Sequence, residues 1–134
     1  MRYSQLNSGD EVLLKDAEAL IIDCFGLLSS IYRYGKIAYV GGGFGVGIHN
    51  LPEAAVWNIP VLFGPNHDKF QEAKELKACG GGLAIYGAES FGKAMDNLLQ
   101  NAEILKQASD AAGNYVKTHS GAANMILRHV KSEE

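Results

Sequence analysis

The chain has 134 residues, of which 47% are hydrophobic and 20% charged, a size and composition that fit one globular domain and exclude a disordered or fibrous protein. The net charge is −3 and the 12 basic residues are scattered along the chain, which argues against a nucleic-acid-binding face. Because no apolar run reaches the roughly 18 residues of a membrane helix, and residues 1–5 lack the apolar core of a signal peptide, we expect a cytoplasmic protein.

Short apolar runs alternate along the chain with segments of helical periodicity. The expected strands are residues 12–14, 20–22, 37–40, 61–63 and 83–86. The expected helices are residues 25–35, 50–59, 70–79, 91–99, 104–116 and 122–130, the last one behind a cap at Ser120. Apolar runs without polar alternation are typical of strands covered on both faces. The order of elements therefore predicts an α/β fold, a three-layer, Rossmann-like parallel sheet with helices on both faces.

The first residues do not fit the start of such a fold. Residues 1–18 offer only a polar segment, where a Rossmann-like half normally begins with a clear strand and a full helix. We therefore expect residues 1–134 to form a single, truncated domain, with the chain beginning inside that domain.

A glycine-rich segment links the expected strand at 37–40 to the helix that begins near Asn50. Five of residues 41–47 are glycine, and we call this segment the glycine loop. Open parallel sheets bind ligands beyond the carboxyl ends of their strands, and glycines let backbone N–H groups approach an anion. The loop matches neither the GxGxxG nor the GxxxxGK[ST] motif. We interpret it as a phosphate-binding loop of another kind or, alternatively, as glycines that only permit tight strand-to-helix packing.

Two side chains that follow the glycine loop have a structural alternative. Asn50 and Glu53 have the spacing of a capping box, in which the glutamate bonds back to the backbone at the helix start. His49 has the alternative role of a structural histidine beside the loop.

The remaining histidines and the cysteines show no metal-site or disulfide pattern. The four histidines, none with a second ligand at zinc spacing, are His49, His67, His119 and His129. We expect His67 and Asp68 to open the next helix, and His119 and His129 to be exposed on the last one. Cys24 and Cys79 are expected to be unpaired, buried small residues in a reducing compartment.

Three segments carry a resemblance to a known family. They are Val40-Gly41-Gly42-Gly43-Phe44, then His49-Asn50-Leu51-Pro52-Glu53-Ala54-Ala55, then Ile59-Pro60-Val61-Leu62-Phe63-Gly64-Pro65 followed by Phe70. Together they resemble the C-terminal, donor-nucleotide-binding half of 3-deoxy-D-manno-octulosonic acid (Kdo) transferases, which are GT-B glycosyltransferases of lipopolysaccharide biosynthesis. Residues 21–28 and Tyr32 resemble a further segment of that family. The chain departs from it at Gly43, where many relatives have serine, and at Lys69, where asparagine is frequent.

The resemblance implies part of the C-terminal domain of a GT-B fold, with a donor site for CMP-Kdo. The residues that match the family's donor site are Gly42, Gly43, Phe44, His49, Asn50 and Glu53. The first three would lie along the donor phosphate, and Asn50 with the helix that it starts would offer N–H groups to that phosphate. Glu53 would accept hydrogen bonds from the ribose hydroxyls, a role that competes with a capping box. His49 would lie close by.

The same resemblance implies that catalysis needs more than this chain. In GT-B enzymes the N-terminal domain holds the acceptor and the catalytic base, so we expect no catalytic residue and no metal in this chain, which alone would be inactive. CMP-Kdo would be a substrate, without a further cofactor. The acceptor, a lipid A precursor, would bind to the missing domain of a parent enzyme that is peripheral to the cytoplasmic face of the inner membrane. Apolar surface left exposed by an incomplete domain predicts a homodimer of the fragment.

Two alternative functions remain open from the sequence. Another GT-B sugar-nucleotide enzyme, a UDP-sugar transferase or an epimerase, would share the glycine loop and the glutamate. It would fit the His49-Asn50 pair and the Phe63-Gly64-Pro65 run less well. The second alternative is a non-catalytic binding module in which the glycine loop only packs.

Overall fold

The computed structural model describes the backbone of residues 1–132 and the side chains of residues 1–120. The side chains predicted for the face at 122–130, that of His129 included, lie outside the described residues. The chain divides into two compact units, Met1–Ile31 and Tyr32–Glu134. The expectation of one domain over residues 1–134 stays a prediction.

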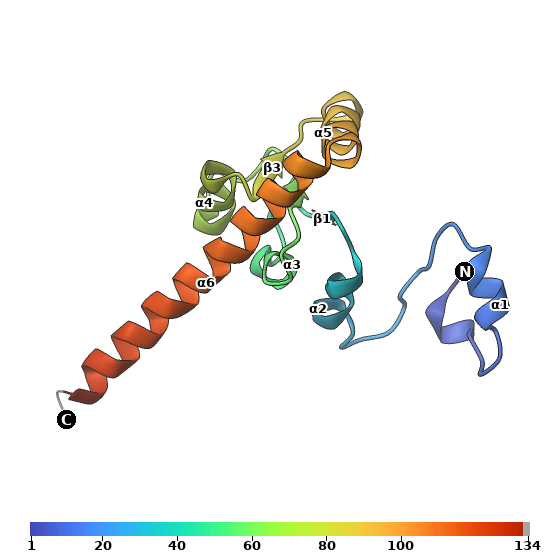
Figure 1. Ribbon diagram of the computed structural model, residues 1–134, viewed down its shortest axis with the longest axis horizontal. Helices are drawn as coiled ribbons and strands as arrows, with labels where there is room; N and C mark the ends of the chain where they lie inside the picture. The colour runs from blue at the N-terminus through green and yellow to red at the C-terminus, as the bar shows by residue number, and fades with distance from the viewer. Residues whose placement is uncertain (133–134) are drawn as a thin grey trace. The chain divides into compact units, whose positions relative to one another are not determined.

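The first unit contains short helical segments joined by irregular chain. They are the 3-10 helix η1 Tyr3–Gln5 and the helices α1 Glu11–Lys15 and α2 Leu28–Ile31 (Figure 1). Asp23 accepts two hydrogen bonds from Ser4, one from the hydroxyl at 2.6 Å and one from the backbone N–H at 2.9 Å. The hydroxyl first, and then the N–H, hold the pKa of the Asp23 carboxyl below its usual value. These bonds join the chain near η1 to the irregular segment that precedes α2.

Two strands predicted for the first unit are wrong. Residues 12–14 lie in α1, and residues 20–22 form only one isolated bridge, at Ile21. The backbone of Ile21 makes two hydrogen bonds of 2.8 Å, with Met1 and Tyr3, while its side chain is 54% exposed. A strand extends only where a neighbouring strand receives its N–H and C=O groups and a covering layer buries its side chains. The apolar run at 20–22 has neither within this unit.

The second unit contains a parallel sheet of three strands. In chain order and in sheet order they are β1 Ala38–Val40, β2 Val61–Phe63 and β3 Gly82–Ala84. The register pairs Leu62 of β2 with Tyr39 of β1 on one side and with Leu83 of β3 on the other. All three residues of β2 are buried, as predicted for a central strand without polar alternation.

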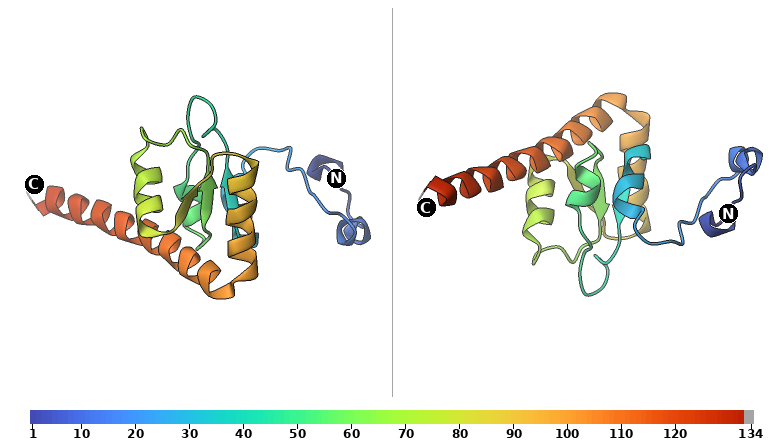
Figure 2. Two further views of the ribbon diagram at one scale, coloured as in Figure 1. Left: turned by 90° about the horizontal axis from the view of Figure 1, so that it is seen from above. Right: turned by 90° about the horizontal axis from the view of Figure 1, so that it is seen from below.

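Helices cover both faces of this sheet. They are η2 Tyr32–Tyr34, α3 Pro52–Ala55, α4 Gln71–Cys79, α5 Ala88–Gln100 and α6 Ala102–Ser132. Figure 2 shows α4 and α5 on opposite sides of the strands, with α6 passing from α5 toward α4. The predicted α/β fold, with a Rossmann-like parallel sheet between two helical layers, is therefore confirmed, although the sheet has three strands rather than five.

Each face of the sheet has its own hydrophobic core. Val61 and Phe63 pack on one face with buried residues of α3, α4 and α6. Leu62 packs on the other face with Leu98 of α5 and Ala108 of α6. Because α6 contributes to both cores, it joins the two helical layers.

The path of α6 depends on a close contact beside the amino end of β3. A Cβ on Gly81 would lie 2.6 Å from the backbone nitrogen of Ala112, so only glycine permits this approach. Gly80 ends α4 with φ of 87°, the left-handed conformation that glycine adopts readily after the last residue of a helix. The predicted break at Ser120 is wrong, because α6 runs from Ala102 to Ser132 without interruption. A serine cap contributes only about 1 kcal/mol, and the local sequence alone does not enforce it against a continuing helix.

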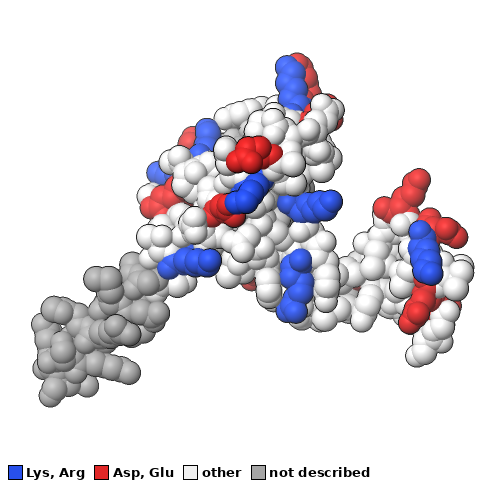
Figure 3. All heavy atoms as spheres, viewed as in Figure 1, with Lys and Arg blue, Asp and Glu red and all other residues white. Residues whose placement is uncertain are grey.

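The surface of the described residues carries both cysteines and well-mixed charges. Cys24 and Cys79 are unpaired, but they are exposed, so the prediction that they are buried is wrong. Cys79 is the last residue of α4 and bonds to the Leu76 carbonyl at 3.2 Å, within the surface turn that ends the helix. On the face that Figure 3 shows, basic and acidic side chains are interspersed. No helix in the described part of the chain has the length and hydropathy needed to cross a membrane.

Candidate functional site

The loops that follow β1 and β2 lie at one edge of the sheet, because parallel strands end on the same side. The glycine loop, residues 41–47, follows β1, and residues 64–70 follow β2. The glycine loop is closed at its base by a backbone hydrogen bond of 3.2 Å from His49 to Gly41. It therefore occupies the edge where open parallel sheets bind ligands.

Two glycines of the loop are required by close approaches of the backbone. Gly42 has φ of 93°, and a Cβ there would overlap the Gly47 carbonyl oxygen. Gly43 is buried against the loop that follows β2, where a Cβ would lie 2.5 Å from the Gly64 backbone nitrogen. The packing role that was considered as the alternative is therefore real, although the partner of Gly43 is a second loop rather than a helix.

The glycine loop also presents backbone donors. The N–H groups of Phe44 and Val46 have no acceptor among the described residues, and both residues are exposed. The Gly45 N–H between them donates to the Gly42 carbonyl at 3.0 Å, so the open donors lie on alternate residues. Backbone N–H groups without a protein acceptor are available to bind an anion. The loop thus combines the tight packing of Gly43 with two donors that are open to a ligand.

Asn66, which the sequence analysis did not single out, joins the two loops. Its backbone N–H donates to the Gly43 carbonyl at 2.8 Å, and its side-chain Nδ2 donates to the Gly45 carbonyl at 3.0 Å. We call these two hydrogen bonds the Asn66 bridge. Both acceptors are backbone carbonyls, which every residue has, so no pattern of residue types could predict the contact. The only available signal was an asparagine that follows a Gly-Pro turn at the carboxyl end of a strand.

Two cavities flank the Phe70 ring beside the loops. One, of about 330 Å³, is lined by Gly45, Asn66 and Lys69 among others. The other, of about 320 Å³, is lined by residues from Ile48 to Leu51 together with Glu72 and Phe70. Predicted site residues His49 and Asn50 line the second cavity, whereas the exposed Phe44 lines neither of them.

The capping box, which the sequence offered as the alternative role of Asn50 and Glu53, is wrong. Helix α3 begins at Pro52 with Leu51 as its N-cap, and no side chain caps it. Proline suits the first helical position because its φ is already helical and its missing N–H is not needed there. The side chain of Asn50 instead donates from Nδ2 to Oε1 of Glu53 at 3.1 Å. The spacing of three residues thus produces a side-chain pair rather than a cap.

Glu53 belongs to α3, which packs against η2. Its bond from Asn50 is the only hydrogen bond of its side chain among the described residues. Burial first, and then the charge of Glu53, raise the pKa of the Tyr32 hydroxyl. The structure therefore brings Glu53 and Asn50 together, with Tyr32 near enough to feel the carboxylate, while Glu53 lines neither cavity.

The prediction that His67 and Asp68 open a helix is wrong. The backbone turns there, with Phe70 N donating to the His67 carbonyl at 3.0 Å, and α4 begins only after this turn. His67 is 5% exposed, and its Nδ1 lies 3.2 Å from the Gly64 carbonyl oxygen. It therefore anchors the loop that carries Asn66. Among the described residues, no three His, Cys, Asp or Glu side chains gather as metal ligands.

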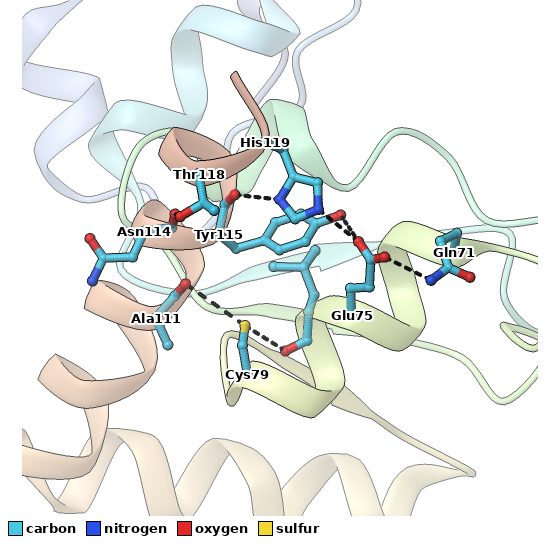
Figure 4. Close-up of polar contacts among 9 residues, drawn as sticks. Gln71, Glu75, Cys79, Ala111, Asn114, Tyr115, Thr118 and His119 are labelled. Carbon is cyan, nitrogen blue, oxygen red and sulfur yellow. Dashed lines mark hydrogen bonds and ion pairs between the residues drawn. The ribbon is translucent and has the colours of Figure 1, made fainter. Parts of the chain in front are cut away.

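A polar cluster joins α4 to α6 (Figure 4). Oε2 of Glu75 accepts a hydrogen bond from the Tyr115 hydroxyl at 3.0 Å and lies 2.9 Å from Nε2 of His119, while Oε1 accepts from Gln71 at 2.7 Å. The bond from Gln71, followed by that from Tyr115, lowers the pKa of the Glu75 carboxyl. Burial, and then the bond to Glu75, raise the pKa of the Tyr115 hydroxyl. His119 is exposed, as predicted, but its ring also helps to fix α6 against α4.

Comparisons with known proteins identify several relatives that share one protein name. A 3-deoxy-D-manno-octulosonic acid transferase of Aquifex aeolicus is 36% identical over 93 residues, which are 68% of this chain and 26% of the relative. The enzyme of the same name from Chlamydia pneumoniae is 31% identical over 84% of this chain, and the one from Rickettsia typhi is 27% identical over 93% of it. No protein-family model matches the chain.

The extent of these matches defines the relationship. The chain spans about a quarter of the length of these curated relatives, at 26% and 28% of their residues. The matches together cover most of this chain and carry a single protein name. The predicted resemblance to the 3-deoxy-D-manno-octulosonic acid transferases is therefore confirmed, and the chain is homologous to a segment of them, while its assignment to their C-terminal, donor-binding half stays a prediction.

Proposed function

We propose that this chain is the donor-binding part of a Kdo transferase, within the C-terminal domain of a GT-B fold, and that it binds CMP-Kdo for transfer to a lipid A precursor. Similarity to Kdo transferases supports the choice of enzyme. The observation that carries the donor site is the pair of open N–H groups, of Phe44 and Val46, at the carboxyl edge of the sheet. A nucleotide-activated sugar offers a phosphate to these donors.

The phosphate is bound in this proposal by peptide groups rather than by a helix end. Helix α3 has four residues and begins with Pro52, which has no N–H, so it offers little to an anion. The glycine loop instead supplies N–H groups held in place by the contact between Gly43 and Gly64. Preformed donors of this kind bind an anion without reorganisation of the loop.

The ribose is assigned to Glu53. A carboxylate accepts hydrogen bonds from both hydroxyls of a vicinal diol, and Oε2 of Glu53 is not used by another described residue. Asn50 holds Oε1 and thereby orients the carboxylate. His49 and Asn50 lie in the sequence between the glycine loop and Glu53, and they line the cavity beside Phe70.

In this proposal the chain binds and orients the donor, and chemistry depends on further residues. Transfer to a lipid A precursor requires a general base and an acceptor site, which we assign to parts of the enzyme outside these 134 residues. The donor is a substrate, so no resident cofactor is involved. With its base elsewhere, the chain alone is expected to be inactive, and the whole enzyme to act at the cytoplasmic face of the inner membrane.

Calorimetric titration of CMP into the chain tests the donor site, with UMP as the competing nucleotide. Glu53→Gln is the decisive variant, because an amide keeps the partner of Asn50 but loses the charge. Hydrogen bonds to a charged acceptor contribute about 1.5–3 kcal/mol, against about 1 kcal/mol for neutral ones. We expect roughly tenfold weaker CMP binding. Glu89→Gln, on the exposed face of α5, is the matched control and should bind CMP like the unchanged chain.

Three results would argue against the proposal. Equal CMP affinity in Glu53→Gln would remove Glu53 from the site. Tighter binding of UMP than of CMP would favour the alternative of a UDP-sugar enzyme. Absence of any nucleotide binding would favour a module in which the glycine loop only packs.

A further inference from the structure

The Asn66 bridge acts on the same two peptide groups that carry the open donors. Its acceptors are the carbonyls of Gly43 and Gly45. The open N–H groups belong to Phe44 and Val46, the residues that directly follow these two glycines. Each carbonyl therefore shares one peptide plane with one open N–H group.

Because the carbonyl and the N–H group lie in one peptide plane, the direction of the carbonyl fixes the direction of the N–H group. A trans peptide is planar, with its C=O and N–H pointing in opposite directions, and the described chain contains no cis peptide bond. The bridge draws the carbonyls of Gly43 and Gly45 toward Asn66. The N–H groups of Phe44 and Val46 are consequently directed to the opposite side of the loop, both of them away from Asn66.

We propose that Asn66 is a positioning residue, which aligns the Phe44 and Val46 N–H groups so that they bind one anionic group together. The inference rests on the proposed donor site, in which that group is the phosphate of the nucleotide. Asn66 does not touch the phosphate in this arrangement. It fixes the two peptide planes from behind, through the Asn66 bridge.

The glycine loop needs such a constraint. Glycine has more conformational freedom than other residues, and five glycines in seven positions make the free loop costly to order. Binding an anion to a mobile loop would require that ordering at the moment of binding. A loop already fixed by the Asn66 bridge avoids this cost, so the bridge increases affinity without a contact of its own.

Removal of the side-chain bond tests the proposal. Asn66→Ala deletes the bond to Gly45 but keeps the backbone bond to Gly43, and Asn66 is exposed, so we expect little change in the unfolding midpoint. CMP affinity should fall about fivefold to tenfold, the effect of one neutral hydrogen bond. Asn114→Ala is the matched control, since Asn114 is exposed on α6 and its side chain makes no hydrogen bond among the described residues.

Amide NMR spectra separate failure of this inference from failure of the donor site. In the ligand-free chain, Asn66→Ala should shift the amide resonance of Val46 and lower its heteronuclear 15N NOE, because the Gly45–Val46 peptide plane becomes more mobile, whereas Asn114→Ala should not. If the unchanged chain binds CMP and Asn66→Ala binds it equally well, Asn66 is not a positioning residue. If the unchanged chain does not bind CMP, the donor site is wrong. The Val46 amide then decides alone, because an unaltered resonance and NOE in Asn66→Ala would overturn the proposed alignment.

Discussion

Substitution of Gly43 by alanine tests the contact between the two loops of the site. The added Cβ would lie 2.5 Å from the Gly64 nitrogen and 2.7 Å from its Cα, whereas ordinary contact begins at 3.4 Å. Both neighbouring atoms belong to the backbone, so no side-chain rotation relieves the overlap. The loops must separate by about 0.9 Å, the difference between 3.4 and 2.5 Å. The 2.8 Å bond from Asn66 to Gly43 would lengthen beyond hydrogen-bonding distance.

Overpacking of this kind costs about 1–3 kcal/mol. We therefore expect Gly43→Ala to lower the free energy of unfolding by that amount, measured by urea denaturation followed with circular dichroism. CMP affinity should fall in parallel because the loop donors move. Gly41→Ala is the control for stability, since a Cβ at Gly41 meets no atom within 4 Å. Equal unfolding free energies for Gly43→Ala and Gly41→Ala would refute the contact from which the geometry of the site was derived.

Four further predictions concern stability. Leu76→Ala should lower the unfolding free energy by about 2–5 kcal/mol, because Leu76 is 0% exposed in the core shared by α4 and α6. Asn50→Ala should change the melting temperature little, since Asn50 does not cap α3; a loss of about 1 kcal/mol would restore the cap. Because the folded chain lowers the pKa of Glu75, the carboxylate stabilises the fold at pH values above 4.5, its ordinary pKa. We expect this contribution to be lost as the pH falls through the lowered pKa, which acid-side thermal melts would measure. The raised pKa of Tyr115 stabilises the fold below 10.0, and Tyr115→Phe should abolish the loss on alkalinisation in pH-dependent melts.

The sheet of the second unit could be predicted because its signals are local and agree with one another. The runs at 37–40 and 61–63 are apolar on both faces, and each is followed by a turn signal. The run at 20–22 is equally apolar, yet it forms one bridge and leaves Ile21 exposed. Its difference lies in the neighbours that it finds rather than in its own residues, and no local pattern contains that information.

The candidate site was predicted in part, for a comparable reason. The position of the glycine loop follows from its place after a strand. The bond between Asn50 and Glu53 was not foreseen, because a spacing of three residues fits both a capping box and a side-chain pair. Pro52 decides between them by starting α3 two residues after Asn50, which moves Asn50 out of the capping position.

The open donors of the site are peptide groups, and residue types typical of functional sites therefore indicate only the residues around them. His49, Asn50 and Glu53 have such residue types, but the open donors at the loop are the peptide groups of Phe44 and Val46. The orientation of these peptide groups depends on the residue types at neighbouring positions rather than on the side chains of Phe44 and Val46. The requirement on Gly43 is the absence of a Cβ beside Gly64, and the requirement on Asn66 is a side-chain donor that reaches the Gly45 carbonyl. Phe44 and Val46 themselves can change to other residues without loss of the N–H groups, so Val46→Ala should retain CMP binding that Gly43→Ala loses. Weakened binding in Val46→Ala to the same degree would instead assign the contact to the side chain and would remove the peptide groups from the donor site.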